Sequence, residues 1–311
     1  MQRHRYQRRS QRTMGTTSLH TPRPRRRPPK AWGAGRSVRT LHSPAATHEP
    51  HDRPRSPEAH GGTAVRNGPL AIIEFDGEGH NTFSTDKMRG ITELVWQLGD
   101  TPDVEGLVLY GGDGRSFGVG GDFNEVKDFT GGSEVNRWID ACVDMYRAVL
   151  SISKPTVAVI DKYCIGIGLQ LALCADWRIG TSTSDLRMPE LKLGISCILG
   201  APLLQRRVGP AVANRMIIGC DRWLGTTALS DGLLDELVAA HSDPLAAGCT
   251  RAQALAEYQS VPFARTKAFV NHDLLLDMER ARIAAIAGHR AGFAAGDAAQ
   301  QKMRTIVGDN P

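Results

Sequence analysis

The chain has 311 residues, of which 41% are hydrophobic and 23% charged, and this composition is ordinary for a globular protein of one or two domains. No stretch approaches about 18 uninterrupted apolar residues, so the sequence predicts no membrane-spanning helix. Its six cysteines lie at least ten positions apart. This spacing fits neither a CxxC metal pair nor a disulfide scaffold, so we expect reduced thiols in a cytoplasmic protein.

The formal net charge of +5 is divided unevenly along the chain. Residues 1–65 hold 14 Lys and Arg against 3 Asp and Glu, a net of +11, so the remaining residues carry a net of −6. The same stretch holds 8 of the 17 prolines, and such a composition cannot bury enough apolar surface to fold. We therefore expect a disordered tail over residues 1–65, with the folded protein beginning near Arg66.

The tail itself has several possible roles. An Arg-rich start is typical of organelle transit peptides, although this one lacks amphipathic spacing. The pair Arg8–Arg9 fits twin-arginine export, but no apolar segment follows it. Polycationic arms also bind nucleic acid without sequence specificity. We favour a dispensable extension, with Met14 as an alternative start, and expect neither a nucleic-acid nor a membrane partner.

Strand and helix patterns alternate from residue 70 onward. Ser84 precedes a run of helical spacing and is the expected N-cap of that helix. Strand–helix alternation predicts a parallel sheet with right-handed crossovers, and after about residue 200 the pattern becomes mostly helical. The expected strands are 70–77, 105–112, 156–161 and 176–180, and the expected helices are 84–100, 138–152, one beginning near Gly166, and several within 243–307.

Two glycine-rich segments, 116–127 and 161–176, follow the second and third expected strands. Ligands of open parallel sheets collect at the carboxyl ends of strands, so both segments should face one cleft. Each segment leads into a helix, whose first N–H groups have no partner inside the helix. Two such amides that converge on one carbonyl oxygen would form an oxyanion hole.

Five short motifs lie along the folded part of the sequence: FxxGGD at 117–122, KPT at 154–156, GxG at 166–168, CAD at 174–176 and PExxxG at 189–194. With these motifs, the chain resembles the crotonase (enoyl-CoA hydratase/isomerase) superfamily from about Leu70 to its C-terminus. The resemblance implies an α/β fold with a crotonase-like ββα spiral core over 66–250 and a helical C-terminal region over 251–311 that forms trimers, alone or paired into hexamers. It also implies an acyl-CoA substrate, with coenzyme A as part of the substrate, no permanently bound cofactor and no metal.

The resemblance places the two oxyanion amides on Gly121 and Ile167. Only the N–H is used at each position, so the side chain of Ile167 is no obstacle. The neighbouring glycines let the backbone approach a substrate closely, and we count them as substrate-binding residues. They are Gly120, Gly166 and Gly168.

The positions of the two glutamates found in the family's hydratases carry Gln170 and Glu190 here. An amide can orient water but cannot exchange a proton near neutral pH, whereas hydration needs both an acid and a base. The change is reasonable if the bound species is an anion. A carboxylate about 5 Å from a malonyl carboxylate or enolate costs roughly 3 kcal/mol at an effective dielectric of about 20.

Within the superfamily, several strings resemble the carboxymethylproline synthase family. That resemblance implies decarboxylation of malonyl-CoA, capture of the enolate by a pyrroline-5-carboxylate-like imine or semialdehyde, and thioester hydrolysis assisted by Glu190. It also places a pocket tryptophan at Trp138. The sequence departs from that family at Lys162 and Leu275, which affects the identity of the electrophile. The strings are HNTFS, GGDFNEVK, WIDxxxDMYxAVL, GxGLQ and MPELKxGIxC.

Other assignments remain open at this stage. His80 lies where the family's coenzyme A segment passes, although we favour its interpretation as a turn histidine. Arg66 and Lys267 could contact coenzyme A phosphates or be ordinary surface charges. Asp122 should cap the helix that follows it. Two alternative functions remain: an enoyl-CoA hydratase or isomerase with an altered acid/base pair, and an RNA-binding protein that uses the crotonase fold.

Overall fold

The computed structural model describes residues 61–77, 79–239 and 242–309. The expectations for residues 1–60 lie outside this part of the chain. Strand β1 (Gly62–Asn67) pairs antiparallel with β2 (Leu70–Phe75). Strand β1 thus begins four residues before Arg66, near which the sequence predicts the start of the folded protein; the pattern of 62–67 is too short to be separated from the polar stretch before it.

The main sheet has six strands in the order β1-β2-β3-β5-β7-β10. All neighbours after the β1–β2 pair are parallel, as the strand–helix alternation predicts. The four expected strands are present with slightly shorter bounds. The remaining members of the sheet are β3 (Gly106–Tyr110), β5 (Thr156–Ile160), β7 (Trp177–Gly180) and β10 (Glu236–Leu237).

A second sheet of four short strands was not predicted from the sequence. Strands of two or three residues contain too few positions to show a period of two, so no pattern distinguishes them from loops. They pair in the order β4-β6-β8-β9. The strands are β4 (Gly118–Val119), β6 (Tyr163–Ile165), β8 (Asp185–Arg187) and β9 (Arg222–Leu224).

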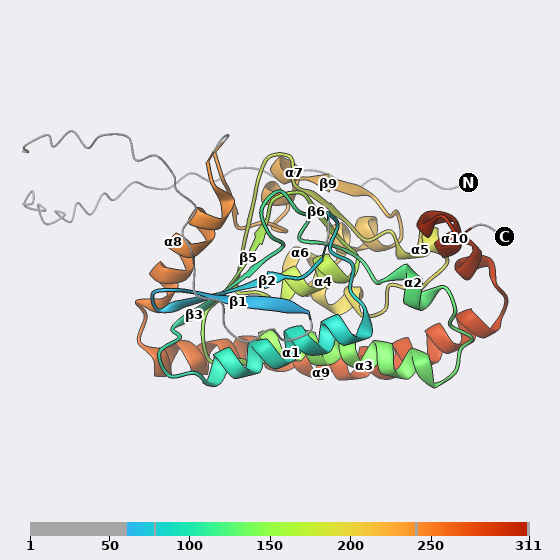
Figure 1. The fold of residues 1–311 in the computed structure, drawn as a ribbon, viewed down its shortest axis with the longest axis horizontal. Helices are drawn as coiled ribbons and strands as arrows, with labels where there is room; N and C mark the ends of the chain where they lie inside the picture. The colour runs from blue at the N-terminus through green and yellow to red at the C-terminus, as the bar shows by residue number, and fades with distance from the viewer. Residues whose placement is uncertain (1–60, 78, 240–241, 310–311) are drawn as a thin grey trace, which may run out of the picture. The chain divides into compact units, whose positions relative to one another are not determined.

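Three long helices lie side by side along one edge of the fold (Figure 1). Helix α1 (Thr85–Asp100) begins after Ser84, whose side chain accepts a hydrogen bond from Lys87 N as predicted. Helix α3 (Ser133–Ser151) begins five residues before the expected position and packs against both α1 and α9 (Ser260–Ala294). The buried side chains of α9 recur every three or four residues, so one stripe of this helix faces the core.

The other helices connect the sheets and close the pocket described below. The predicted boundary at residue 250 was wrong, because it falls inside α8, a continuous helix over 244–256. No described helix is long and apolar enough to cross a membrane. The other helices are α2 (Phe123–Val126), α4 (Ile167–Cys174), α5 (Glu190–Leu193), α6 (Gly200–Ile217), α7 (Gly225–Ser230), α8 (Pro244–Ala256) and α10 (Ala298–Val307).

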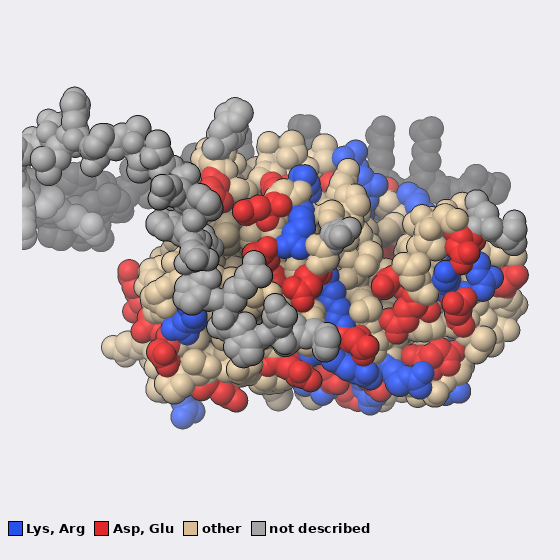
Figure 2. All heavy atoms as spheres, viewed as in Figure 1, with Lys and Arg blue, Asp and Glu red and all other residues tan. Residues whose placement is uncertain are grey.

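Charges of both signs are interspersed on the face seen in Figure 2. Elsewhere in the fold as well, opposite charges pair within one helix, among them Arg89 with Asp86 on α1 and Arg147 with Asp144 on α3. Pairs of this exposed kind contribute little to stability. On this face the surface therefore presents no extended patch of a single sign.

Candidate functional site

The register of the small sheet brings the two glycine-rich segments together. Strands β4 and β6 are parallel, with Gly118 opposite Cys164 and Val119 opposite Ile165. Gly121 and Ile167 each lie two residues after the paired Val119 and Ile165. A methyl group built on Gly121 would lie 3.6 Å from the Ile167 Cδ1 atom, which confirms that the two segments lie next to each other.

Close backbone contact at this point requires glycine. Gly168 packs on β4 so tightly that an added Cβ would lie 2.5 Å from the carbonyl oxygen of Gly118. Gly166 has φ +56° and ψ −121°, a conformation that a residue with a side chain rarely adopts, and it turns the chain from β6 into α4. Gly168 thus holds α4 against β4, and it does not line the pocket between the two segments.

Both candidate oxyanion amides are outside the local hydrogen-bond pattern. The bridge between Phe83 and Gly121 uses the Gly120 carbonyl and the Asp122 N–H, which leaves the N–H of Gly121 out of this bridge. Ile167 is the first residue of α4, and the first N–H groups of a helix lack partners inside it. Both residues line the same pocket.

Helix α4 is buried along its whole length, with all eight residues in the core. Its C-terminal carbonyl groups are satisfied by two guanidinium groups: Arg207 donates to Leu173 O and Ala175 O, and Arg178 also donates to Ala175 O. Positive charge at the C-terminus of a helix complements its dipole. The N-terminus, which carries the positive end of the dipole, faces the pocket.

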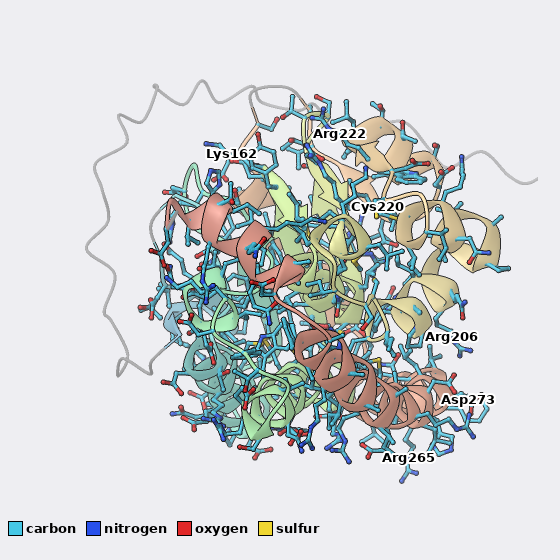
Figure 3. The ribbon with its side chains drawn as sticks, turned by 90° about the vertical axis from the view of Figure 1, so that its right-hand side faces the viewer. Lys162, Arg206, Cys220, Arg222, Arg265 and Asp273 are labelled. Carbon is cyan, nitrogen blue, oxygen red and sulfur yellow. The ribbon has the colours of Figure 1, made fainter. Side chains whose placement is uncertain are left out.

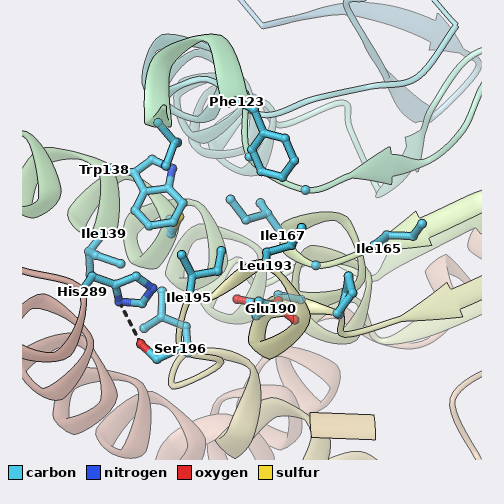
Figure 4. A pocket seen from close by; sticks show the side chains of 18 of the residues that line it. Phe123, Trp138, Ile139, Ile165, Ile167, Glu190, Leu193, Ile195, Ser196 and His289 are labelled. Atoms are coloured by element: carbon cyan, nitrogen blue, oxygen red, sulfur yellow. Dashed lines mark hydrogen bonds between the residues drawn. The ribbon is translucent and has the colours of Figure 1, made fainter. Parts of the chain in front are cut away.

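The pocket itself has an empty volume of about 620 Å³, open solvent included (Figure 4). Most of its wall is apolar. Among the described residues that line it, Glu190 is the one carboxylate, and none is Lys or Arg. Seven of the residues singled out from the sequence lie on this wall: Gly120, Gly121, Trp138, Gly166, Ile167, Gln170 and Glu190.

Gln170 and Glu190 form a hydrogen-bonded polar pair in the wall of the pocket. Gln170 Nε2 donates to Glu190 Oε1 at 3.1 Å, and Glu190 Oε2 has no hydrogen-bond partner in the described part of the chain. Burial raises the pKa of Glu190 from its usual 4.5 to about 7, and the hydrogen bonds it accepts act in the opposite direction without offsetting the burial. A carboxyl group with this pKa can take up or release a proton near neutral pH.

Trp138 and His289 form another wall of the pocket (Figure 4). The indole Nε1 of Trp138 is buried without a hydrogen-bond partner among the described residues, and the two rings meet edge to face at 5.5 Å. The ring nitrogen His289 Nδ1 lies 2.8 Å from Ala285 O, so Nδ1 carries the proton of the neutral ring and Nε2 is an acceptor. Burial lowers the pKa of His289, which favours this neutral form.

His289 was missed in the sequence analysis, although the sequence contains a signal for it. On α9, the positions Ala281, Ala285, His289 and Phe293 recur at intervals of four and are all buried. A histidine within an apolar stripe of a helix is a candidate for a pocket or a buried network. Ser196, which lies 3.4 Å from His289 Nδ1, is in a segment without regular structure and gave no comparable signal.

Two further candidates lie away from the pocket. His80 is exposed, its Nδ1 is 2.9 Å from Ser116 Oγ and its ring packs against Tyr163, so it is not among the residues that line the pocket. Lys267 was considered for coenzyme A phosphates, but it is buried and its Nζ pairs with Asp176 at 2.7 Å. The cap predicted at Asp122 is confirmed by its 2.9 Å bond from Asn124 N.

A metal site would need several ligands within reach of one point. No group of three or more His, Cys, Asp or Glu side chains suitable for a metal ion occurs in the described residues. The buried cysteines Cys142, Cys164, Cys174, Cys197 and Cys220 are free thiols. In the described part of the chain, the residues that line the pocket offer one carboxyl, one side-chain amide, one imidazole, one hydroxyl and one indole N–H.

Residues 66–302 match the model of the enoyl-CoA hydratase/isomerase family. The chain belongs to this family. Among curated proteins, it is 37% identical over 229 residues to carboxymethylproline synthase of Pectobacterium carotovorum, which covers 74% of this chain and 91% of that protein. It is 28% identical over 159 residues to crotonyl-CoA hydratase of Syntrophomonas wolfei, which covers 51% of this chain and 61% of the other.

Solved structures agree with the family assignment. ThnE from S. clavuligerus is 38% identical, has a TM-score of 0.64 and covers 73% of this chain and 99% of its own. An enoyl-CoA hydratase/isomerase from Mycobacterium paratuberculosis has a TM-score of 0.72 at 20% identity and covers 82% of this chain and all of its own, which supports the fold alone. The predicted crotonase-like α/β fold is thereby confirmed.

Proposed function

We propose that this family member decarboxylates a malonyl-CoA thioester, couples the resulting enolate to a pyrroline-5-carboxylate-like imine, and hydrolyses the product thioester. The observation that carries the proposal is the pocket's polar content: one carboxylate, Glu190, beside an amide at the place where a second carboxylate would be expected for hydration. The similarity to carboxymethylproline synthase supports the same assignment.

The first step needs stabilisation of an anion rather than a base. The bond between the malonyl carboxylate carbon and the α-carbon breaks, CO₂ leaves, and the electron pair forms an enolate whose oxygen gains negative charge. The N–H groups of Gly121 and Ile167 donate to that oxygen in this proposal. Loss of one such donor typically costs about 3 kcal/mol of transition-state stabilisation.

Gln170 suits this first step because it is uncharged. With the malonyl carboxylate and the enolate both negative, a second carboxylate in the pocket would repel them, and the apolar wall would strengthen that repulsion. The amide instead offers a donor, which it directs to Glu190.

The second step requires an electrophile next to the enolate. The α-carbon of the enolate bonds to the imine carbon, and the C=N electron pair goes to nitrogen, which is neutral afterwards if the imine was protonated. Trp138 offers an unpartnered buried N–H donor, and His289 offers an acceptor nitrogen on the same wall. A donor and an acceptor side by side suit an electrophile that carries both a carboxylate and a protonated nitrogen.

The last step is hydrolysis of the thioester. Glu190 takes a proton from water while the water oxygen bonds to the thioester carbon. The C–S bond then breaks and the departing thiolate receives the proton from Glu190. A carboxyl group whose pKa lies near 7 can perform both transfers at neutral pH.

The test is to incubate the protein with malonyl-CoA, with and without pyrroline-5-carboxylate, and to follow CO₂, free coenzyme A and the carboxymethyl product by mass spectrometry. The proposal expects product only when both substrates are present. Absence of both CO₂ release and acyl transfer would refute it.

Hydration or isomerisation of an enoyl-CoA is the second candidate function. The observation in its favour is the pKa of Glu190, because a single carboxyl near its midpoint can act as the acid and as the base. The similarity to crotonyl-CoA hydratase points the same way. Two results together would favour this candidate over the first. The protein would turn over crotonyl-CoA and lose this activity in Glu190→Ala, and it would release no CO₂ from malonyl-CoA.

A further inference from the structure

Three buried side chains from three helices form a continuous hydrogen-bonded chain. Tyr146 of α3 donates its hydroxyl to Gln170 Oε1 at 3.1 Å, and Gln170 of α4 donates Nε2 to Glu190 Oε1 of α5, also at 3.1 Å. The side chains are 0%, 5% and 7% exposed, respectively. Within this series, the position of each group therefore depends on its protein neighbours.

Chemistry as well as geometry determines which group donates and which accepts in each of these hydrogen bonds. A primary amide has a donor end and an acceptor end, and an ionised carboxylate can only accept. If the amide of Gln170 were turned by 180°, its oxygen would face the oxygen of Glu190, and the two would repel each other unless Glu190 were protonated. The arrangement with Nε2 toward Glu190 is thus the one that suits an ionised carboxylate.

The phenol at the other end completes this arrangement. Its hydroxyl satisfies the Gln170 oxygen, which would otherwise be a buried acceptor without a partner. A hydrogen bond to the carbonyl oxygen of an amide also polarises the amide, and this strengthens the hydrogen bond that its N–H group donates. The pocket-lining residues are Gln170 and Glu190, whereas Tyr146 lies behind them and does not reach the pocket.

We infer that Tyr146 is a positioning residue: its hydroxyl holds the Gln170 amide with Nε2 toward Glu190 and so keeps that carboxylate in the form that can act as a base. Its importance for turnover rests on the proposed function. The hydrogen-bonded chain itself does not, because it involves protein groups alone.

Other titratable groups near Glu190 must be considered in any test of this kind. Cys197 approaches it from the segment after α5, and His289 lines the same pocket from α9. On its own short helix, Lys192 directs its Nζ to Cys220 O at 3.1 Å. On α3, Cys142 lies next to the Tyr146 hydroxyl. Burial raises the pKa of both thiols, so neither is charged near neutral pH.

The decisive measurement is the titration of Glu190 followed directly. The infrared carboxyl band that disappears in Glu190→Gln identifies this group, and its intensity against pH gives the midpoint in the wild type and in Tyr146→Phe. We expect the midpoint to rise by about one pH unit in the variant, the size of effect that loss of a hydrogen-bonded stabilisation of a charged form produces. An unchanged midpoint would overturn the inference.

Two further variants separate positioning from a general loss of packing. Tyr110→Phe is the matched control, because Tyr110 is also buried and its hydroxyl bonds to Asp113 at 2.8 Å, far from the pocket. It should leave the Glu190 midpoint where it is. In a Gln170→Met background, Tyr146→Phe should cause no further shift, since Tyr146 acts through Gln170; a shift of equal size there would contradict the inference.

A substitution in the opposite direction keeps the test decisive even if Tyr146→Phe folds poorly. Replacement of Tyr146 by 3-fluorotyrosine retains the ring and makes the hydroxyl a stronger donor, so the Glu190 midpoint should fall. Activity is measured in parallel. In Tyr146→Phe, the acid limb of the pH profile of thioester hydrolysis should move to higher pH, and the rate of CO₂ release should be unchanged. If malonyl-CoA is not consumed at all, the proposed function fails, whereas the infrared titration still decides the role of Tyr146.

Discussion

Gln170 and Glu190 lie side chain to side chain, with Nε2 of the amide 3.1 Å from Oε1 of the carboxylate. They come from two helices, α4 and α5, and both line the apolar pocket. This single contact determines the charge of the site, because a carboxyl group at position 170 would face another carboxyl at hydrogen-bonding distance. Two carboxylates so close repel each other strongly, so a second charge in this pocket is unfavourable.

Gln170→Glu should therefore change the preference among substrates. A second negative charge about 5 Å from a malonyl carboxylate costs roughly 3 kcal/mol at an effective dielectric of about 20, so kcat/KM for malonyl-CoA should fall about 100-fold. Hydration of crotonyl-CoA should rise, because the site then offers two carboxyl groups that can share the work of acid and base. The measurement is kcat/KM for both thioesters.

Gln205→Glu is the matched control for this substitution, since Gln205 is exposed on α6 and lies outside the pocket wall. It should change neither value of kcat/KM. Equal kinetics for Gln170→Glu and the wild type would mean that residue 170 has no part in the choice of substrate.

Substitution of Gly121 by proline removes the N–H at this position. Gly121→Pro deletes this donor, and we expect the rate of CO₂ release from malonyl-CoA to fall by about 100-fold or more while coenzyme A still binds. Gly121→Ala is the control, because it keeps the N–H and its new methyl group would lie 3.4 Å from Trp138 Cζ2, an ordinary contact. Both rates are measured by trapped CO₂, and coenzyme A binding by calorimetry. Similar losses in the two variants would speak against an amide donor at this position.

Much of the main sheet and the pocket wall could be predicted from the sequence, because buried strands and glycine-rich strand ends are local patterns. The strands over 106–110 and 156–160 were expected from short apolar runs, and the turn at Gly166 from its glycine spacing. The features that could not be predicted depend on contacts between segments far apart in the sequence. Only the pairing of β4 with β6 brings the segments that contain Gly121 and Ile167 together, and strands of two or three residues carry no pattern of their own.

The contacts of individual side chains likewise could not be predicted from the sequence. Lys267 gave no sign that it is buried, because its partner Asp176 is 91 residues away along the chain. His289 comes from the C-terminal half of a helix of 35 residues, which spans about 52 Å and so connects distant parts of the fold. In both cases the decisive neighbour is set by the packing of α9 and not by local sequence.

Lys267→Met should lower stability and leave the affinity for the thioester substrate unchanged. The Asp176 carboxylate would keep its bonds from Thr156 N and Oγ1, at 2.8 and 2.9 Å, but would lose its cation. Removal of one partner of a buried pair typically costs about 3–5 kcal/mol, and here we expect about 3 because Asp176 is partly exposed. Urea unfolding measures the loss, and the exposed Lys302→Met is the control. A higher KM for malonyl-CoA without a loss of stability would restore a role in binding.

The trimer implied by the family resemblance is a prediction that the N-terminal half of α9 makes testable. Phe269 is 85% exposed, and Val261 and Val270 are exposed near it. Figure 3 shows Arg265 and Asp273 of the same helix pointing outward. We expect the protein to form trimers and Phe269→Glu to reduce their mass to that of a monomer, because an interface cannot bury an unpaired charge cheaply. Light scattering after gel filtration measures the mass; a monomeric wild type would contradict the prediction.

Glu190 should also make stability depend on pH. Its pKa is about 7 in the folded protein against 4.5 ordinarily, so the folded state binds more protons than the unfolded state between these values. The contribution of Glu190 to the free energy of unfolding is therefore fully present below about pH 4.5 and is lost as the pH rises through 7. Glu190→Gln removes this dependence. Relative to the wild type, the variant should gain about 2–3 kcal/mol between pH 5 and pH 8, which urea unfolding at both values measures. A constant difference between the two proteins across this range would show that Glu190 has the same pKa in the folded and unfolded states, and the acid–base role proposed for it near neutral pH would lose its physical basis.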